Sequence, residues 1–129
     1  MKRTILIVSL FVILVGISVV EEILLKQNLT TLYNKSVNLK NLVEEVENVN
    51  SNLVLDEIDE LDEFWKSCEN YICIVINHIN IEEVGEQLTK IKLLGEQNKK
   101  EELIIEINLL IYYSKSYEHM LIPSLQNIL

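Results

Sequence analysis

The stretch that decides the fold is residues 56–79, DEIDELDEFWKSCENYICIVINHI, which carries the strongest periodic pattern in the chain. Its apolar side chains recur at steps of three and four residues, which keeps them on one side of a helix. The stripe consists of Ile58, Leu61, Trp65, Cys68, Ile72, Val75 and Ile79. Phe64, Tyr71 and Ile76 lie beside it and widen the apolar face, as is typical of a bundle helix. We therefore predict one long amphipathic helix here.

Six carboxylates crowd the start of this helix, between Asp56 and Glu63. Carboxylates are favoured there because the N-terminus of a helix is the positive end of its dipole. The alternative is a Ca²⁺ site, since Ca²⁺ takes several oxygen ligands. Side chains on a helix radiate around its axis instead of converging, and the run contains no EF-hand loop. We therefore predict a solvated helix start.

The residues before this stretch predict a helix of the same kind. Apolar residues again step by three and four, with Ser36 as a polar interruption. This seam consists of Leu25, Leu29, Leu32, Leu39, Val43 and Val46, and it continues to Asn50 and Leu53. We expect the helix to end near residues 48–52, because Asn and Ser side chains compete there for backbone hydrogen bonds.

The residues after the stretch predict two more helices. Asn80, followed by Glu83, fits an N-terminal capping box, and Gly95 fits a C-terminal stop. Residues 96–100 are expected to form a connection, and Pro123 is expected to end the last helix. The two stripes are Ile81, Val84, Leu88 and Ile91, and then Leu103, Ile107, Leu110, Ser114, Tyr117 and Leu121.

The pattern as a whole predicts an all-α protein. No useful length of sequence alternates with the period of a strand, and no Asn-Gly or Asp-Gly turn occurs. An N-terminal transmembrane helix that continues into an antiparallel three- or four-helix bundle would bury these stripes.

The N-terminus has the composition of a membrane span. Residues 4–20, TILIVSLFVILVGISVV, carry no charged side chain. As a helix they would cover about 26 Å at ~1.5 Å per residue, close to the lower limit for crossing a ~30 Å hydrocarbon core. Basic residues before the segment and acidic residues after it predict a cytoplasmic N-terminus and an exported body.

A cleaved signal peptide is the alternative interpretation of this segment. Its best small-x-small cleavage site is Gly16-Ile17-Ser18, which is a poor one. We therefore expect an uncleaved signal anchor. This divides the chain into a cytoplasmic tip and transmembrane anchor, residues 1–25, and an extracytoplasmic helical bundle, residues 26–129, at the cell membrane.

The body is strongly acidic. Lys2 and Arg3 are the only charges in residues 1–20, so the remaining 9 basic and 20 acidic residues give the rest of the chain a net charge of −11. Nucleic acid is excluded as a partner, because such binding needs Lys and Arg to neutralise phosphates. Anionic lipid headgroups are disfavoured by the same sign of charge.

Several features together resemble a known family. They are the apolar N-terminus, the acidic helix with Trp65, His78 followed by Ile81-Glu82, and the ending Asn127-Ile128-Leu129. The chain is similar over nearly its whole length to a domain-of-unknown-function family of small, N-terminally membrane-anchored helical proteins from Gram-positive, often spore-forming, bacteria. The resemblance implies the architecture and a location in the envelope, and it implies no activity, ligand or catalytic residue.

The few candidates for chemistry each have a structural alternative. His78 and Glu82, four residues apart, have the spacing of a metal pair or a pH-sensitive contact. His119 is the only other imidazole, so we expect no metal site, no cofactor site and no catalytic residues. Cys73 lies off the seam, where it could link two chains, whereas Cys68 is expected to pack within the seam.

Aromatic residues offer the remaining candidates for binding. Trp65, with Phe64 and Tyr71, is expected in the core, with a partner-binding patch as the alternative. Tyr112, Tyr113 and Tyr117 on the last helix could form another such surface. The residues proposed for a partner contact or a switch are therefore Trp65, Cys73, His78, Glu82 and Tyr113.

The sequence favours a non-enzymatic interaction or structural protein of the cell envelope. The reason is that the apolar seams are long while catalytic signatures are absent from the sequence. We expect a protein partner or self-association in addition to the single membrane pass, and no small-molecule substrate. The alternative is a ligand- or metal-sensing bundle that acts through a separate transmembrane partner, and an enzyme is the third hypothesis.

Overall fold

The computed structural model describes the backbone of residues 1–75 and 78–128, with side chains for residues 1–69 and 82–117. In this part of the chain there are four helices and no strands, so the all-α prediction is confirmed. The helices are α1 (Lys2–Glu45), α2 (Asn52–Val75), α3 (His78–Glu96) and α4 (Lys100–Ile128).

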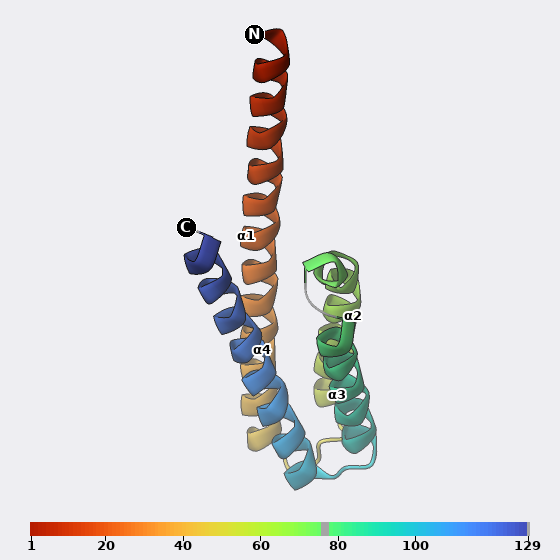
Figure 1. Ribbon diagram of the computed structural model, residues 1–129. Coiled ribbons are helices and arrows are strands. Elements are labelled where there is room, and N and C mark those ends of the chain that lie inside the picture. The colour runs from red at the N-terminus through yellow and green to blue at the C-terminus, as the bar shows by residue number, and fades with distance from the viewer. Residues whose placement is uncertain (76–77, 129) are drawn as a thin grey trace.

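The helices form an up-down-up-down bundle (Figure 1). Helix α1 packs against α2 and α4, and α3 packs against the same two, so each helix touches two antiparallel neighbours. The N-terminal part of α1 projects alone beyond the end where α4 finishes and where α2 and α3 are joined. We call this the anchor-side end of the bundle, and the opposite end the far end.

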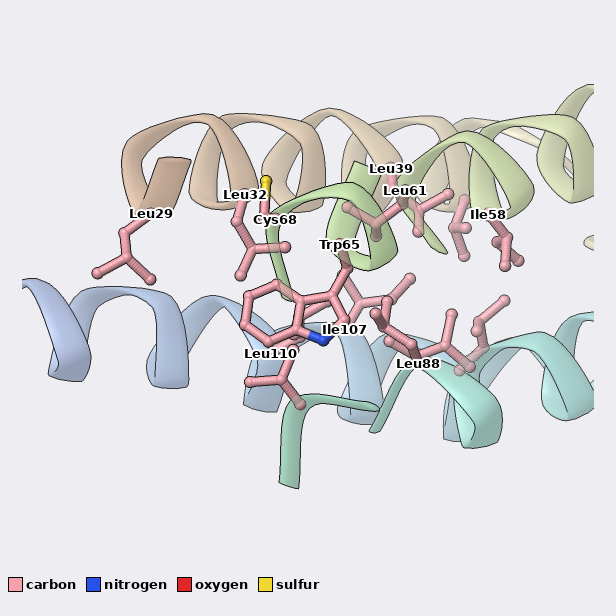
Figure 2. Close-up of a cluster of buried hydrophobic side chains, with 14 of the residues drawn as sticks. Leu29, Leu32, Leu39, Ile58, Leu61, Trp65, Cys68, Leu88, Ile107 and Leu110 are labelled. Atoms are coloured by element: carbon pink, nitrogen blue, oxygen red, sulfur yellow. The ribbon is translucent and has the colours of Figure 1, made fainter. Parts of the chain in front are cut away.

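The core follows the heptad stripes of the four helices. In α1 the buried residues are Leu25, Leu29, Leu32, Ser36, Leu39 and Val43, as predicted. The predicted extension of this seam to Leu53 is wrong, because Leu53 lies in the first turn of α2 and is 60% exposed. Figure 2 shows Ile58, Leu61 and Trp65 of α2 meeting apolar side chains of the other helices in this core. The other buried hydrophobic residues are Val49, Val54, Cys68, Val84, Leu88, Ile91, Leu103, Ile107, Leu110 and Tyr117.

Two serines interrupt the apolar seams without leaving a polar atom unsatisfied. The hydroxyls of Ser36 and Ser114 donate to the carbonyl oxygens of Leu32 and Leu110, at 2.7 and 2.9 Å. Each bond stays within one helix, one turn back, so the small side chain is accommodated without a partner from a neighbouring helix.

The far end is closed by a network between its two connections. Asn98 has a left-handed backbone, φ 55°, and its Oδ1 accepts a 2.8 Å hydrogen bond from the Val49 N–H. Lys100 Nζ donates to the carbonyl oxygen of Val46, 2.6 Å away, just beyond the last turn of α1. A cation is favoured at that position because the C-terminus is the negative end of a helix dipole.

Three predicted helix boundaries are wrong. Helix α3 begins at His78, so Asn80 is its third residue and not its cap. The same helix runs past Gly95 to Glu96, and the left-handed residue is Asn98. Helix α4 continues through Pro123 to Ile128, because a proline removes one backbone donor but leaves later residues able to stay helical. The turn predicted at residues 48–52 is confirmed, since α1 ends at Glu45 and α2 begins at Asn52.

Candidate functional site

Helix α4 carries a second apolar stripe on the side opposite the core. Ile105, Leu109 and Tyr112 are separated by four and three residues, and Ile105 and Tyr112 remain 64% and 65% exposed. This is the same spacing that builds the core stripe, displaced to the solvent side of the helix. A bundle helix with one apolar stripe would instead present polar residues here, so the stripe needs a separate explanation.

A groove between α3 and α4 extends this stripe. It encloses about 360 Å³ and is lined by Lys90, Leu93, Leu94, Gln97, Glu102, Ile105 and Glu106. Three of its lining residues, Leu93, Leu94 and Ile105, are apolar, and the other four are polar or charged. We refer to Leu93, Ile105, Leu109 and Tyr112 as the α3–α4 face, because all four are exposed large apolar residues on these two helices.

Two polar contacts fix the walls of the groove relative to each other. The buried Gln87 amide of α3 donates to the main-chain oxygen of Glu106 at 2.9 Å and also to the Glu106 carboxylate. The Tyr117 hydroxyl donates to Glu83 Oε2 at 3.3 Å. Burial, reinforced by the charge of the Glu83 carboxylate, raises the pKa of Tyr117 well above its ordinary value. This tyrosine therefore stays protonated and able to donate throughout the neutral range.

The tyrosines of α4 divide between the core and the surface. Tyr117 is buried, Tyr113 is half-buried, and Tyr112 is exposed. The rings of Tyr113 and Tyr117 are nearly parallel, with 6.1 Å between their centroids. Tyr113, a predicted contact residue, therefore supports the bundle with one side of its ring, while the exposed aromatic surface is supplied by Tyr112.

Trp65 is a core residue, which confirms the structural interpretation of this side chain. It is only 3% exposed, and its Nε1 is buried without a hydrogen-bond partner among the described residues. Its neighbour Phe64 is half-buried, with the Lys35 ammonium 5.7 Å from the ring centroid. Trp65 is therefore not available to a partner in the folded bundle.

Of the other predicted site residues, only Glu82 has a side chain that the structure describes. Glu82 is exposed near the start of α3. The side chains of Cys73, His78 and His119 lie outside the described residues. Among the side chains that are described, no group of three or more His, Cys, Asp or Glu is arranged to hold a metal ion.

The acidic start of α2 is ion-paired in two places. Asp62 lies 2.9 Å from Lys66 within the helix, and Asp59 lies 3.2 Å from Lys92 of α3. These carboxylates point toward separate cations instead of a shared centre. The predicted placement of these carboxylates at the N-terminal end of the helix is wrong, because α2 begins at Asn52 and has no acidic residue in its first turn. Their predicted exposure to solvent agrees with these ion pairs, which add little stability.

This stripe of α4 exposes apolar side chains that an apolar surface can contact. The sequence contained the signal for it, because Ile105, Leu109 and Tyr112 repeat with helical spacing. The sequence analysis identified the buried stripe of α4 correctly and named Tyr112 as a candidate surface residue, but it did not consider Ile105 and Leu109 as part of a second stripe.

Comparison with protein-family models, with curated proteins and with solved structures finds no match to this chain. The resemblance to a family of anchored helical proteins therefore stays a prediction, and the function is argued from the structure alone.

Proposed function

We propose that this protein is a membrane-anchored, non-enzymatic component of the cell envelope, whose extracytoplasmic bundle docks another envelope protein on the α3–α4 face. The observation that carries the proposal is the exposed stripe of Ile105, Leu109 and Tyr112 opposite the core. Large contiguous apolar patches on a soluble surface are typical of interaction sites.

The first part of α1 supports the anchor. It is the one described helix long and apolar enough to cross a membrane, and residues 1–21 are exposed throughout. Helix α1 is also continuous from Lys2 to Glu45, so the apolar segment and the first seam of the bundle form one rigid rod. Leu25 is the first buried residue, which separates an unpartnered segment from a packed one.

The shape of the groove supports a helix as the docked element. The groove lies between two antiparallel helices and is lined by the apolar Leu93, Leu94 and Ile105 together with charged residues, which include Lys90 of α3 and Glu102 of α4. An amphipathic helix places apolar anchors every three or four residues into such a groove, and charges at the border then set its direction. Tyr112 adds an exposed aromatic ring of the kind that dominates binding energies at interfaces.

A photo-crosslinking amino acid placed at Ile105 in the full-length protein tests the docking proposal in native membranes. We expect an adduct with one envelope protein from position 105, and none from an equally exposed position on another helix, Glu60 of α2. The adduct should disappear when Leu109→Glu is added, because a charge in the stripe would have to be desolvated on binding.

The outcomes of this experiment are distinct. An adduct between two copies of the chain would show that the α3–α4 face mediates self-association and does not bind a different protein. Equal adducts from positions 105 and 60, or none from positions 105 and 112, would overturn the proposed face. Digestion of the body by protease added to intact cells is expected from the proposed orientation, and full protection would contradict it.

A further inference from the structure

Two segments of the sequence lack charged residues. Residues 70–81, NYICIVINHINI, and residues 119–129, HMLIPSLQNIL, contain no Asp, Glu, Lys or Arg. The rest of the bundle is densely charged, and all 20 acidic residues lie outside these segments. Such runs are unexpected on the surface of a body with a net charge of −11 unless that part of the surface avoids water.

The topology brings both segments to the anchor-side end. Helix α2 finishes there at Val75, α3 begins there at His78, and α4 finishes there at Ile128. Figure 1 shows these helix ends on the side from which the N-terminal part of α1 projects. The far end is different, because its connections include the charged residues Glu47 and Lys99.

The lengths of the helices place these ends at the level where α1 leaves the apolar segment. From Glu45 back to Glu22, α1 rises by about 34 Å at ~1.5 Å per residue. Helix α2 rises by the same ~34 Å from Asn52 to Val75, and α4 by about 42 Å from Lys100 to Ile128. The contact between Lys100 and Val46 fixes the starting level of α4 beside the end of α1.

Helix α1 is not covered by the bundle at this level. Ile23 and Leu24 are 52% and 45% exposed, and burial begins only at Leu25. Leu121, Leu125 and Ile128 continue the heptad positions of the α4 core stripe toward the same level. The register of α4 therefore continues its stripe to a level at which no residue of α1 is buried.

We propose that the anchor-side end, residues 70–75, 78–81 and 119–128, rests in the interfacial layer of the membrane that holds the anchor. The contact is apolar insertion, by which uncharged helix ends enter the boundary between headgroups and acyl chains. Anionic headgroups would repel the acidic body, so the contact does not depend on them. This inference rests on the proposed membrane anchor, and it gives the bundle a fixed height above the bilayer with the α3–α4 face turned sideways.

Tryptophan quenching by brominated phosphatidylcholine in vesicles containing the full-length protein tests this contact. The added reporters are Leu125→Trp and Ile74→Trp, one in each uncharged segment, and the control is Leu53→Trp, an exposed position at the far end. Trp65 is buried in the middle of the bundle and supplies a constant background. We expect the reporters at 125 and 74 to lose emission with bromines near the headgroups, while the reporter at 53 does not.

A fourth variant, Val12→Trp, separates this inference from the anchor. If position 12 is quenched while positions 125 and 74 behave like 53, the bundle stands clear of the lipid and the inference is overturned, whereas the anchor remains. If position 12 is not quenched either, the anchor itself fails. Quenching at 125 and 74 that requires anionic lipid would also contradict apolar insertion.

Discussion

Asn98 joins the two connections at the far end, because it satisfies a backbone donor of the α1–α2 connection from a left-handed position in the α3–α4 connection. Asn98→Ala loses the hydrogen bond to Val49 and strains the left-handed backbone. We expect a loss of about 2–3 kcal/mol in the free energy of unfolding. Denaturant unfolding followed by circular dichroism measures this loss.

Asn98→Gly is the matched control for this prediction. Glycine also removes the side-chain hydrogen bond, but it adopts positive φ without strain. The glycine variant should therefore be more stable than the alanine variant by about 1 kcal/mol. Equal stability of the two variants would show that the backbone conformation of Asn98 contributes nothing.

The raised pKa of Tyr117 predicts that the folded protein loses stability at high pH. Its pKa in the folded protein lies above the ordinary value of 10.0, so folding favours the protonated phenol. The resulting stabilisation is complete below pH 10 and is lost progressively as the pH rises above it. Tyr117→Phe should be less stable at neutral pH by about 1 kcal/mol, because the hydrogen bond to Glu83 is lost.

The same variant tests the cause of the alkaline effect. Thermal unfolding of both proteins between neutral pH and pH 11 should show a smaller decrease in Tm for Tyr117→Phe than for the wild type. Equal decreases in the Tm of the two proteins would mean that folding does not raise the pKa of Tyr117.

At the scale of the helix, the stripes of α1 and α2 could be predicted and several ends could not. Steps of three and four residues identified Leu25 to Val43 and Ile58 to Cys68 because burial repeats with the helical period. Gly95 and Pro123 were misjudged, because α3 runs to Glu96 and α4 to Ile128 although both residue types locally favour the end of a helix. No local pattern revealed that Gly95 is needed for close packing.

Gly95 lets α3 approach α2 closely. A Cβ at this position would lie 2.9 Å from Ile58 Cδ1 and 3.3 Å from Leu55 Cδ2. In Gly95→Ala, the higher helix propensity of alanine should add about 1 kcal/mol to the free energy of unfolding. Overpacking against Ile58 and Leu55 should subtract about 1–3 kcal/mol and cancel that gain. Ile58→Val removes the Cδ1 atom, so Gly95→Ala should be better tolerated in that background, with a coupling of at least about 0.5 kcal/mol in a double-mutant cycle.

Gly85 provides the control within the same helix. A Cβ added there meets no atom within 4 Å, so Gly85→Ala should stabilise α3 by about 0.5–1 kcal/mol. Denaturant unfolding of the three single variants and the double variant gives the cycle. Additive effects of Gly95→Ala and Ile58→Val would contradict a direct contact between these positions.

At the scale of the whole molecule, the sequence predicted the architecture better than the candidate site. The anchor-like segment and the bundle follow from composition and period, which are properties of single segments. The α3–α4 face depends on which exposed residues of α3 and α4 lie next to each other, and this is decided by how the two helices pack. Trp65 illustrates the same limit, because an aromatic residue on a seam fits a core or a binding patch equally well until its neighbours are known.

Because Leu25 is the first buried residue of α1, the bundle should fold without the N-terminal apolar segment. No buried residue precedes Leu25, so a chain of residues 21–129 keeps every core contact of the full-length protein. It should unfold cooperatively, with the helical content expected from α2, α3, α4 and the rest of α1. Its denaturation midpoint should match that of the full-length protein in detergent, because residues 1–20 contribute no buried residue to the core. A molten body, without cooperative unfolding, would show that the apolar segment of α1 stabilises the bundle.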